Sequence, residues 1–375
     1  MGSEPGGIFL AKPERPRDGI RLAVKDLFDT AGLTTTYGSV IYSDHVPDRT
    51  AESVSRLEAA GYANVGKTNL HEFAYGITSV NPHFGTVPNP IAPGRIAGGS
   101  SGGSAAALAA GLADAALGSD SGGSVRIPAA WCGVVGFKPT YGLVPLEGCF
   151  PLAPSFDHAG PMATSVPACT VMMGALADGF EPRSVESLEE FQVGIAWLEL
   201  ADPVVRARVG EAAELFPRRR TVQVPLPEGV GPVFMREAAD VHRDLFAEFA
   251  DSYGDNVRTK IEVCLAVTDA EYERAVRVRD EYRERLAEAC EDVDLLLTPT
   301  LGFVAPRLPV DDLEIREATI RFTYPFNILG WPALALPCGP AEDGLPASVQ
   351  LVGRAGADAL VLAAGEALER ALSLE

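Results

Sequence analysis

The sequence lacks several features that mark metal-binding, secreted or membrane proteins. Its six cysteines are scattered without paired spacing and form no CxxC motif, and its five histidines show no metal-ligand spacing. We therefore expect reduced, mostly buried thiols and no metal site. No apolar run is long enough to span a bilayer, and residues 1–17 are polar and contain proline, unlike a signal peptide. These absences predict a cytoplasmic protein.

Positive charge is also scarce. The 31 Lys and Arg residues stand against 51 Asp and Glu residues, which gives a formal net charge of −20. Such a field repels phosphate, so we expect neither a nucleic-acid partner nor an anionic membrane partner. The simplest interpretation of the net negative charge is that it keeps the protein soluble. With 375 residues, 47% of them hydrophobic, the chain can bury a large core.

Short apolar strands alternate with helices along the chain. Strands are predicted at 20–24, 65–67, 192–196, 293–297, 333–336 and 348–352, and helices at 50–60, 104–117, 203–215, 268–289 and 357–372. This alternation indicates an α/β fold with a covered sheet. Because no repeat, low-complexity linker or clear boundary interrupts the pattern, we expect one compact domain.

Two glycine- and serine-rich stretches bracket the predicted helix at 104–117. Residues 98–104 read GGSSGGS and residues 118–126 read GSDSGGSVR. A Gly/Ser run is often a flexible linker, but the apolar flanks disfavour a linker here. Glycine allows close approach of the backbone, so the N–H groups of residues 121–124 could bind a substrate oxyanion. Arg126 is expected to pair with Asp120 rather than to bind substrate.

A serine nucleophile in these stretches needs a base. No Ser–His–Asp order stands out, which leaves a neutral lysine as the base. Lys25 is the best candidate because it ends an apolar strand, where loss of hydration would lower its pKa. On the sequence alone, an ion pair between Lys25 and the adjacent Asp26 is the simpler interpretation.

A second pattern would select a different nucleophile. Residues 99–103 match G-x-S-x-G, the nucleophile elbow of α/β-hydrolases, and would make Ser101 the nucleophile. The elbow requires a strand directly before it, whereas a proline-rich loop precedes these residues. Ser100 and Ser101 could also only cap the following helix.

The ordered motifs resemble those of the amidase signature family of Ser–Ser–Lys hydrolases. The segments that carry the resemblance are 23–26, 66–69, 72–76, 89–90, 98–111, 118–128, 133–145, 157–161, 298–300, 326–337 and 345–353. The resemblance covers most of the chain. It implies a single compact domain with a mixed central β-sheet that helices cover on both faces.

The resemblance also divides the domain, residues 1–375, into four stretches. They are a polar N-terminal segment (1–17), a signature core (18–180), a variable, pocket-covering region (181–263), and a C-terminal part of the same sheet with a closing helix (264–375). The resemblance implies no cofactor. It allows a homodimer, whose usual contacts come from helices that most relatives carry before the strand of Lys25.

Each residue of the triad receives a role from the resemblance. Lys25 is expected to act as the base and Ser124 as the nucleophile. Ser100, whose peptide bond from Gly99 is expected to be cis, relays the proton between them. The expected oxyanion donors are the backbone groups of Ser121, Gly122 and Gly123. The expected substrate-binding residues are Ala74, Tyr75, Ser101, Phe150 and Trp331, although Tyr75 and Trp331 could equally be ordinary core residues.

The resemblance therefore implies hydrolysis of a small-molecule carboxylic amide to an acid and ammonia or an amine. The reaction would pass through an acyl-enzyme on Ser124. Two alternatives stay open. The chain could be a glutamine-amidotransferase subunit that delivers ammonia to a partner, or a binding scaffold without catalysis.

Overall fold

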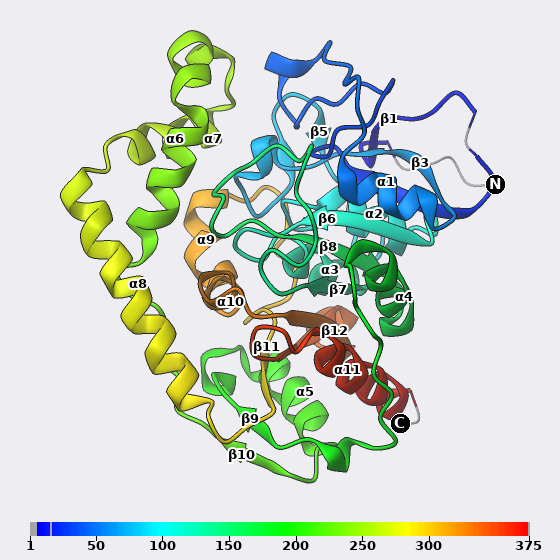
Figure 1. Ribbon diagram of the computed structural model, residues 1–375, viewed down its shortest axis with the longest axis vertical. Coiled ribbons are helices and arrows are strands. Elements are labelled where there is room, and N and C mark those ends of the chain that lie inside the picture. The colour runs from blue at the N-terminus through cyan, green and yellow to red at the C-terminus, as the bar shows by residue number, and fades with distance from the viewer. Residues whose placement is uncertain (1–5, 16, 374–375) are drawn as a thin grey trace.

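The computed structural model describes residues 6–15 and 17–373, and an 11-stranded β-sheet runs through it (Figure 1). The strands, in their order across the sheet, are β1 (Phe9–Ala11), β3 (Tyr62–Thr68), β2 (Ile20–Lys25), β6 (Ala115–Ser119), β8 (Ala159–Ala163), β7 (Val135–Lys138), β12 (Ala333–Pro340), β13 (Pro346–Val352), β11 (Leu295–Pro299), β9 (Val193–Ile195) and β10 (Arg219–Thr221). Strand β2 runs parallel to β3 and β6, whereas β8 runs antiparallel to β6 and β7. The predicted mixed sheet is confirmed.

Helices lie on both faces of this sheet and along one side of it (Figure 1). They are α1 (Glu52–Ala59), α2 (Gly102–Ala109), α3 (Arg126–Cys132), α4 (Val166–Leu176), α5 (Pro203–Glu214), α6 (Gly231–Phe249), α7 (Asp255–Leu265), α8 (Asp269–Ala289), α9 (Asp312–Ile320), α10 (Tyr324–Leu329) and α11 (Asp358–Leu372). Helices α6, α7 and α8 stand together at the left of the picture. None of the described helices is long and apolar enough to cross a membrane.

The side chains of β2 alternate between the two faces, as the two-residue period of a strand requires. Leu22 and Val24 join the core cluster that also contains the buried residues of α1, α4 and α11. Ala23 joins a second cluster, with the buried residues of α2 and α3. Lys25 has the same parity as Ala23, so the strand directs it to the α2 and α3 face.

Strand β3 contains a bulge at Val65, where its register with β2 shifts by one residue. Beyond the bulge, Lys67 lies beside Val24 and Thr68 lies beside Lys25. Partners in adjacent strands share a face of the sheet. The side chains of Lys25 and Lys67 therefore point to opposite faces.

The helix predicted at 104–117 is wrong in its second half. Helix α2 ends at Ala109, and Ala115–Ser119 forms β6 between β2 and β8. Gly111, with a φ of 68°, adopts the left-handed conformation after the end of the helix. A run of alanine and leucine suits a buried strand as well as a buried helix, so its period could not separate the two. The other predicted strands and helices agree with the structure within a few residues.

Two of the predicted stretches contribute more to the sheet than we expected. Strand β1 lies inside the segment 1–17 and pairs with β3, while residues 1–5 and 16 of that segment lie outside the described residues. The region 181–263 supplies β9 and β10 at the other end of the sheet, in addition to α6 and α7. It is therefore more than a cover for the pocket.

The close packing of β8 on β7 predicts an effect on stability. A Cβ at Gly160 would lie 2.2 Å from the carbonyl oxygen of Phe137, so Gly160→Ala requires a backbone shift. We expect it to lower the free energy of unfolding by about 1–3 kcal/mol. Gly210→Ala is the control, because Gly210 lies inside α5 with nothing within 4 Å of such a Cβ. It should stabilise the helix by roughly 0.5–1 kcal/mol. Thermal unfolding measures both, and equal melting temperatures would contradict the prediction.

Candidate active site

Lys25, the last residue of β2, has a completely buried side chain. Its Nζ donates to Ser100 Oγ at 2.7 Å and to Ser119 Oγ at 2.8 Å. Burial lowers the pKa of Lys25 to about 7, and the nearby Asp120 and Asp157 offset only part of this effect. A substantial fraction of the lysine is therefore neutral near pH 7, as a base must be.

Asp26, the next residue, lies on the other face of the sheet. Its Oδ1 is 3.0 Å from Lys67 Nζ, and its Oδ2 accepts hydrogen bonds from the backbone and hydroxyl groups of Thr36. Asp26 thus pairs with Lys67, and the simple interpretation of a Lys25–Asp26 ion pair is wrong.

Ser100 and Ser101 precede α2, and their hydroxyl groups have different partners. The peptide bond before Ser100 is cis, as expected, and its Oγ contacts Lys25. Ser101 Oγ donates to the backbone carbonyl of Ser119 at 3.1 Å, and Ser101 N–H donates to the carbonyl of Ser124 at 3.1 Å. Ser101 makes no capping hydrogen bond to α2. Its hydrogen bonds instead tie the two glycine- and serine-rich stretches together.

The nucleophile-elbow hypothesis for Ser101 finds no support in this geometry. No strand leads directly into Ser101, and none of the five histidines, all of them described residues, bonds to it or to Ser124. His158 is the first histidine after Ser101 in the sequence, but its Nδ1 bonds to the carbonyl of Phe156, and burial lowers its pKa well below the usual value. The elbow would therefore lack its base.

Ser124 lies in the loop between β6 and α3. Its hydroxyl has no hydrogen-bond partner among the described residues, and the residue lines a cavity. In the same part of the chain, the N–H groups of Ser121, Gly122 and Ser124 have no acceptor, whereas the Gly123 N–H donates to Asp120 Oδ1 at 2.8 Å. Three of the four N–H groups are thus available to a substrate oxygen, and that of Gly123 is already used.

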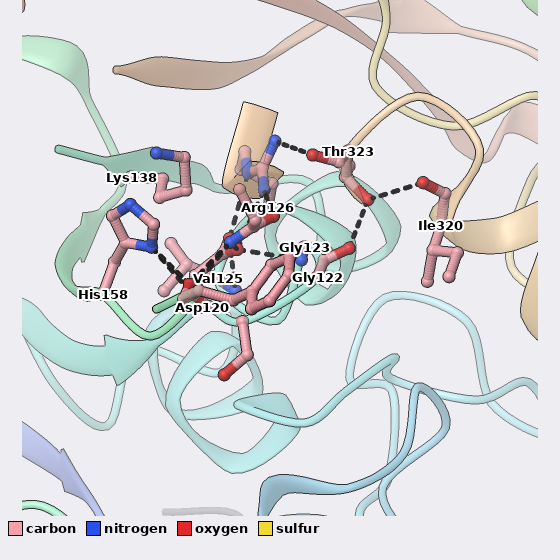
Figure 2. A network of polar contacts seen from close by, with 12 residues as sticks. Asp120, Gly122, Gly123, Val125, Arg126, Lys138, His158, Ile320 and Thr323 are labelled. Carbon is pink, nitrogen blue, oxygen red and sulfur yellow. Dashed lines mark hydrogen bonds and ion pairs between the residues drawn. The ribbon is translucent and has the colours of Figure 1, made fainter. Parts of the chain in front are cut away.

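A buried ion pair holds this loop in place (Figure 2). Arg126 donates from Nε at 3.0 Å and from Nη2 at 2.8 Å to the two carboxylate oxygens of Asp120. Those oxygens also accept the N–H groups of Gly123 and Val125. Burial alone would raise the pKa of Asp120. The Arg126 guanidinium lowers this pKa by more than burial raises it, so the pKa lies well below its usual range. The expected pairing of Arg126 with Asp120 is confirmed.

The peptide unit between Gly122 and Gly123 is fixed at both of its polar atoms. Thr323 Oγ1 donates to the Gly122 carbonyl at 2.7 Å, while the Gly123 N–H bonds to Asp120 (Figure 2). Position 123 requires glycine, because its φ is 128° and a Cβ there would lie 2.3 Å from Thr323 Oγ1. This arrangement leaves the N–H groups on either side of that unit unbonded.

Two adjoining cavities meet at this loop, and both are lined by Ser121 and Leu152. The smaller cavity, about 20 Å³, contains Ser124 and Gly122. The larger cavity, about 150 Å³, is mostly apolar and reaches Ser119 on the side of Lys25. The smaller cavity has about the space that one water molecule needs, and the larger one provides most of the room for a substrate.

The predicted pocket residues are divided between these cavities and the core. Ala74 and Tyr75 line the smaller cavity, and Phe150 lines the larger one. Trp331 lines neither and packs in the main core cluster. Ser101 also lies outside both cavities and has a buried side chain. Of the five predicted residues, the structure brings three to the site.

Three polar residues at the site escaped the sequence analysis. Ser119, the second hydroxyl on Lys25, lies within the glycine- and serine-rich motif and could have been identified there. Arg316 of α9 and Tyr324 of α10 line the smaller cavity, but nothing in their local sequence marks them. Among the described residues, no group of three or more His, Cys, Asp or Glu side chains could hold a metal ion.

Comparison with known proteins assigns this geometry to a family. The family model described as Amidase matches residues 9–194 and 174–362. The chain belongs to the amidase signature family. It is a hydrolase that acts on C–N bonds.

Individual relatives agree with this assignment over nearly the whole chain. AtzE of Pseudomonas sp. (strain ADP), a subunit of 1-carboxybiuret hydrolase, is 37% identical over 385 residues, which cover 94% of this chain and 84% of AtzE. A glutamyl-tRNA(Gln) amidotransferase subunit from Thermosynechococcus vestitus is 35% identical over 89% of this chain and 80% of its own length. A crystal structure of an amidase superposes with a TM-score of 0.87 at 39% identity, covering 94% of this chain and 84% of that one.

The buried ion pair in the loop leads to a second prediction. Arg126→Gln would leave Asp120 buried without its counter-charge, so we expect the free energy of unfolding to fall by about 3–5 kcal/mol. Arg243→Gln is the matched control, because Arg243 forms an exposed ion pair with Asp240 and should matter little. Denaturant unfolding measures both variants. Equal midpoints would show that the ion pair does not stabilise the fold.

Proposed function

We propose that the protein hydrolyses a small-molecule carboxylic amide to a carboxylic acid and ammonia or an amine, with Ser124 as the nucleophile. The observation that carries the proposal is the contact between the buried Lys25 and Ser100, 2.7 Å apart, beside a serine whose hydroxyl is unbonded and reaches a cavity. A lysine with a pKa of about 7 can accept a proton at neutral pH.

Acylation begins with two linked proton transfers. Neutral Lys25 accepts the hydroxyl proton of Ser100, which takes the proton of Ser124, and Ser124 Oγ attacks the amide carbonyl carbon. No hydrogen bond joins Ser100 to Ser124 among the described residues, and such contacts often tighten only when substrate binds. The free N–H groups of Ser121, Gly122 and Ser124 would hold the resulting oxyanion, and losing one such donor typically costs about 3 kcal/mol.

The tetrahedral intermediate collapses when its C–N bond breaks. The proton held by Lys25 returns through Ser100 to the leaving nitrogen, which departs as ammonia or an amine. Water then attacks the Ser124 ester, and its proton passes to Lys25 by the same route. When the bond between Ser124 Oγ and the acyl carbon breaks, this proton returns through Ser100 to Ser124 and the acid is released. Each step uses groups that the loop and β2 hold in place.

The names of the relatives set the range of substrates and partners to test. One relative belongs to a hydrolase and another to an amidotransferase, so ammonia delivery to a partner is the competing outcome. Ammonia release by the purified chain alone, from a panel of amides that includes glutamine, supports free hydrolysis. The homodimer stays a prediction, which the molar mass in solution will test.

Removing the nucleophile gives the most direct test. Ser124→Ala should lower kcat by at least about 10³-fold, because no acyl-enzyme can form. Ser101→Ala is the matched control and should retain most activity, since the Ser101 hydroxyl bonds only to a backbone carbonyl. Intact-mass labelling with a fluorophosphonate, followed by peptide mapping, should place a single adduct on Ser124. An adduct on Ser101 instead would favour the nucleophile elbow.

The lysine base predicts a characteristic pH dependence. Burial lowers the pKa of Lys25 to about 7, so the fraction of neutral, active lysine increases as the pH rises through that value. For a neutral amide, kcat/KM should therefore increase from pH 6 to 8 and then level off. Lys25→Met should abolish the activity at every pH. A value of kcat/KM that falls over this range would exclude Lys25 as the base.

A further inference from the structure

We propose that Arg316 and Tyr324 form a carboxylate-binding site beside Ser124, so that the preferred substrate is a short amide that carries a carboxylate. The inference rests on the proposed function, because it concerns the substrate of the same cavity. Both residues line this cavity, Arg316 from α9 and Tyr324 from the start of α10. Gly122 and Ser124 also line this cavity.

Arg316 is a half-buried cation that forms no ion pair with the described residues. Its guanidinium carbon lies 5.3 Å from the centroid of the Tyr75 ring. Among the described residues, no carboxylate forms an ion pair with Arg316 and no acceptor takes its N–H groups. By contrast, the buried Arg126 donates to several acceptors. A stacked guanidinium keeps its planar fork of donors free, and that fork fits the two oxygens of a carboxylate.

The neighbouring acidic group is not available to neutralise Arg316. Asp312, four residues earlier, accepts Lys260 Nζ at 2.5 Å and the Ile77 N–H at 2.7 Å. His71 is also close to Asp312, and burial lowers the pKa of His71 to about 4, so it is neutral at pH 7. Asp312 is therefore paired with Lys260 rather than with Arg316.

Tyr324 provides a second, independent indication of a polar ligand. Its hydroxyl is buried and has no hydrogen-bond partner in the part of the chain that the structure describes, although the residue lines the cavity. A buried polar group without a partner is costly, and such groups are normally satisfied. Burial raises the pKa of Tyr324, so the hydroxyl keeps its proton and can donate it in a hydrogen bond. A carboxylate between Arg316 and Tyr324 would satisfy both side chains.

The size of the cavity limits the distance between the carboxylate and the amide. Its volume of about 20 Å³ is close to the space that one water molecule needs. A substrate with both groups must therefore also extend into the adjoining cavity of about 150 Å³, and we expect the acyl chain between the two groups to be short, of one or two carbons. The monoamides of short dicarboxylic acids have this chemistry.

Two matched pairs of amides test the proposal by turnover. Malonamate and succinamate carry the carboxylate, whereas acetoacetamide and 4-oxopentanamide replace it with a methyl ketone of similar shape. We expect the wild type to prefer the carboxylate in at least one pair, as measured by kcat/KM. Arg316→Gln should reduce this preference by about 10- to 100-fold, and Tyr324→Phe should reduce it about 3- to 10-fold. Arg316→Lys should retain part of the preference.

The matched control is Arg321→Gln, which removes the same charge from an exposed residue just after α9. This variant should leave the ratio of kcat/KM between the two amides of each pair unchanged. If Arg316→Gln lowers kcat/KM by the same factor for both amides of a pair, the arginine only shapes the wall, and the proposal is wrong. A wild type that prefers both methyl ketones would also overturn it.

A binding measurement separates this proposal from the proposed function, because it needs no turnover. Calorimetry on Ser124→Ala should detect succinate or malonate, and adding Arg316→Gln should weaken the affinity at least about 10-fold. Binding that is absent, or that is equal in the two proteins, would overturn the carboxylate site. If Ser124 is not labelled and no amide is cleaved while the dicarboxylate still binds through Arg316, the proposed function fails and the binding site remains.

Discussion

The arrangement of the active-site loop depends on the buried ion pair between Asp120 and Arg126. Asp120 orders its own loop by accepting two backbone N–H groups, while Arg126 also donates to the Thr323 carbonyl and to the side chains of Gln350 and Asn327. One guanidinium thus joins the nucleophile loop to parts of the chain about 200 residues later. A buried pair with so many hydrogen bonds specifies one conformation even where its net contribution to stability is modest.

Lys25, the proposed base, depends on the opposite condition, because it has no ion-pair partner among the described residues. Asp120 and Asp26 each have a cationic partner, which leaves Lys25 with two serine hydroxyl groups and, in the part of the chain that the structure describes, no carboxylate in contact. Burial without a counter-ion makes the neutral amine accessible at physiological pH. The ion pair of Asp120 therefore rigidifies the loop, whereas Lys25, which must exchange protons, forms no ion pair with any described residue.

Much of the fold could be predicted from the sequence, because most strands and helices have clear periods and caps. The capping box at Thr268 marks the start of α8, for example. The apolar run at 104–117 could not be resolved, since buried strands and buried helices share a composition. The motifs located Lys25 and the serines, but only the structure brings Arg316 to the cavity, because α9 reaches it through tertiary packing.

The bulge at Val65 has a consequence for the proton affinity of the catalytic lysine. If Val65 were paired in a continuous ladder instead of bulging out, Lys25 would have Lys67 instead of Thr68 as its neighbour on the same face. Two ammonium groups would then lie in the same buried layer, and their repulsion would lower the pKa of both lysines strongly. The bulge places Lys67 on the other face of the sheet, where it pairs with Asp26. A single irregularity in the pairing of two strands thereby keeps the positive charge of Lys67 away from Lys25.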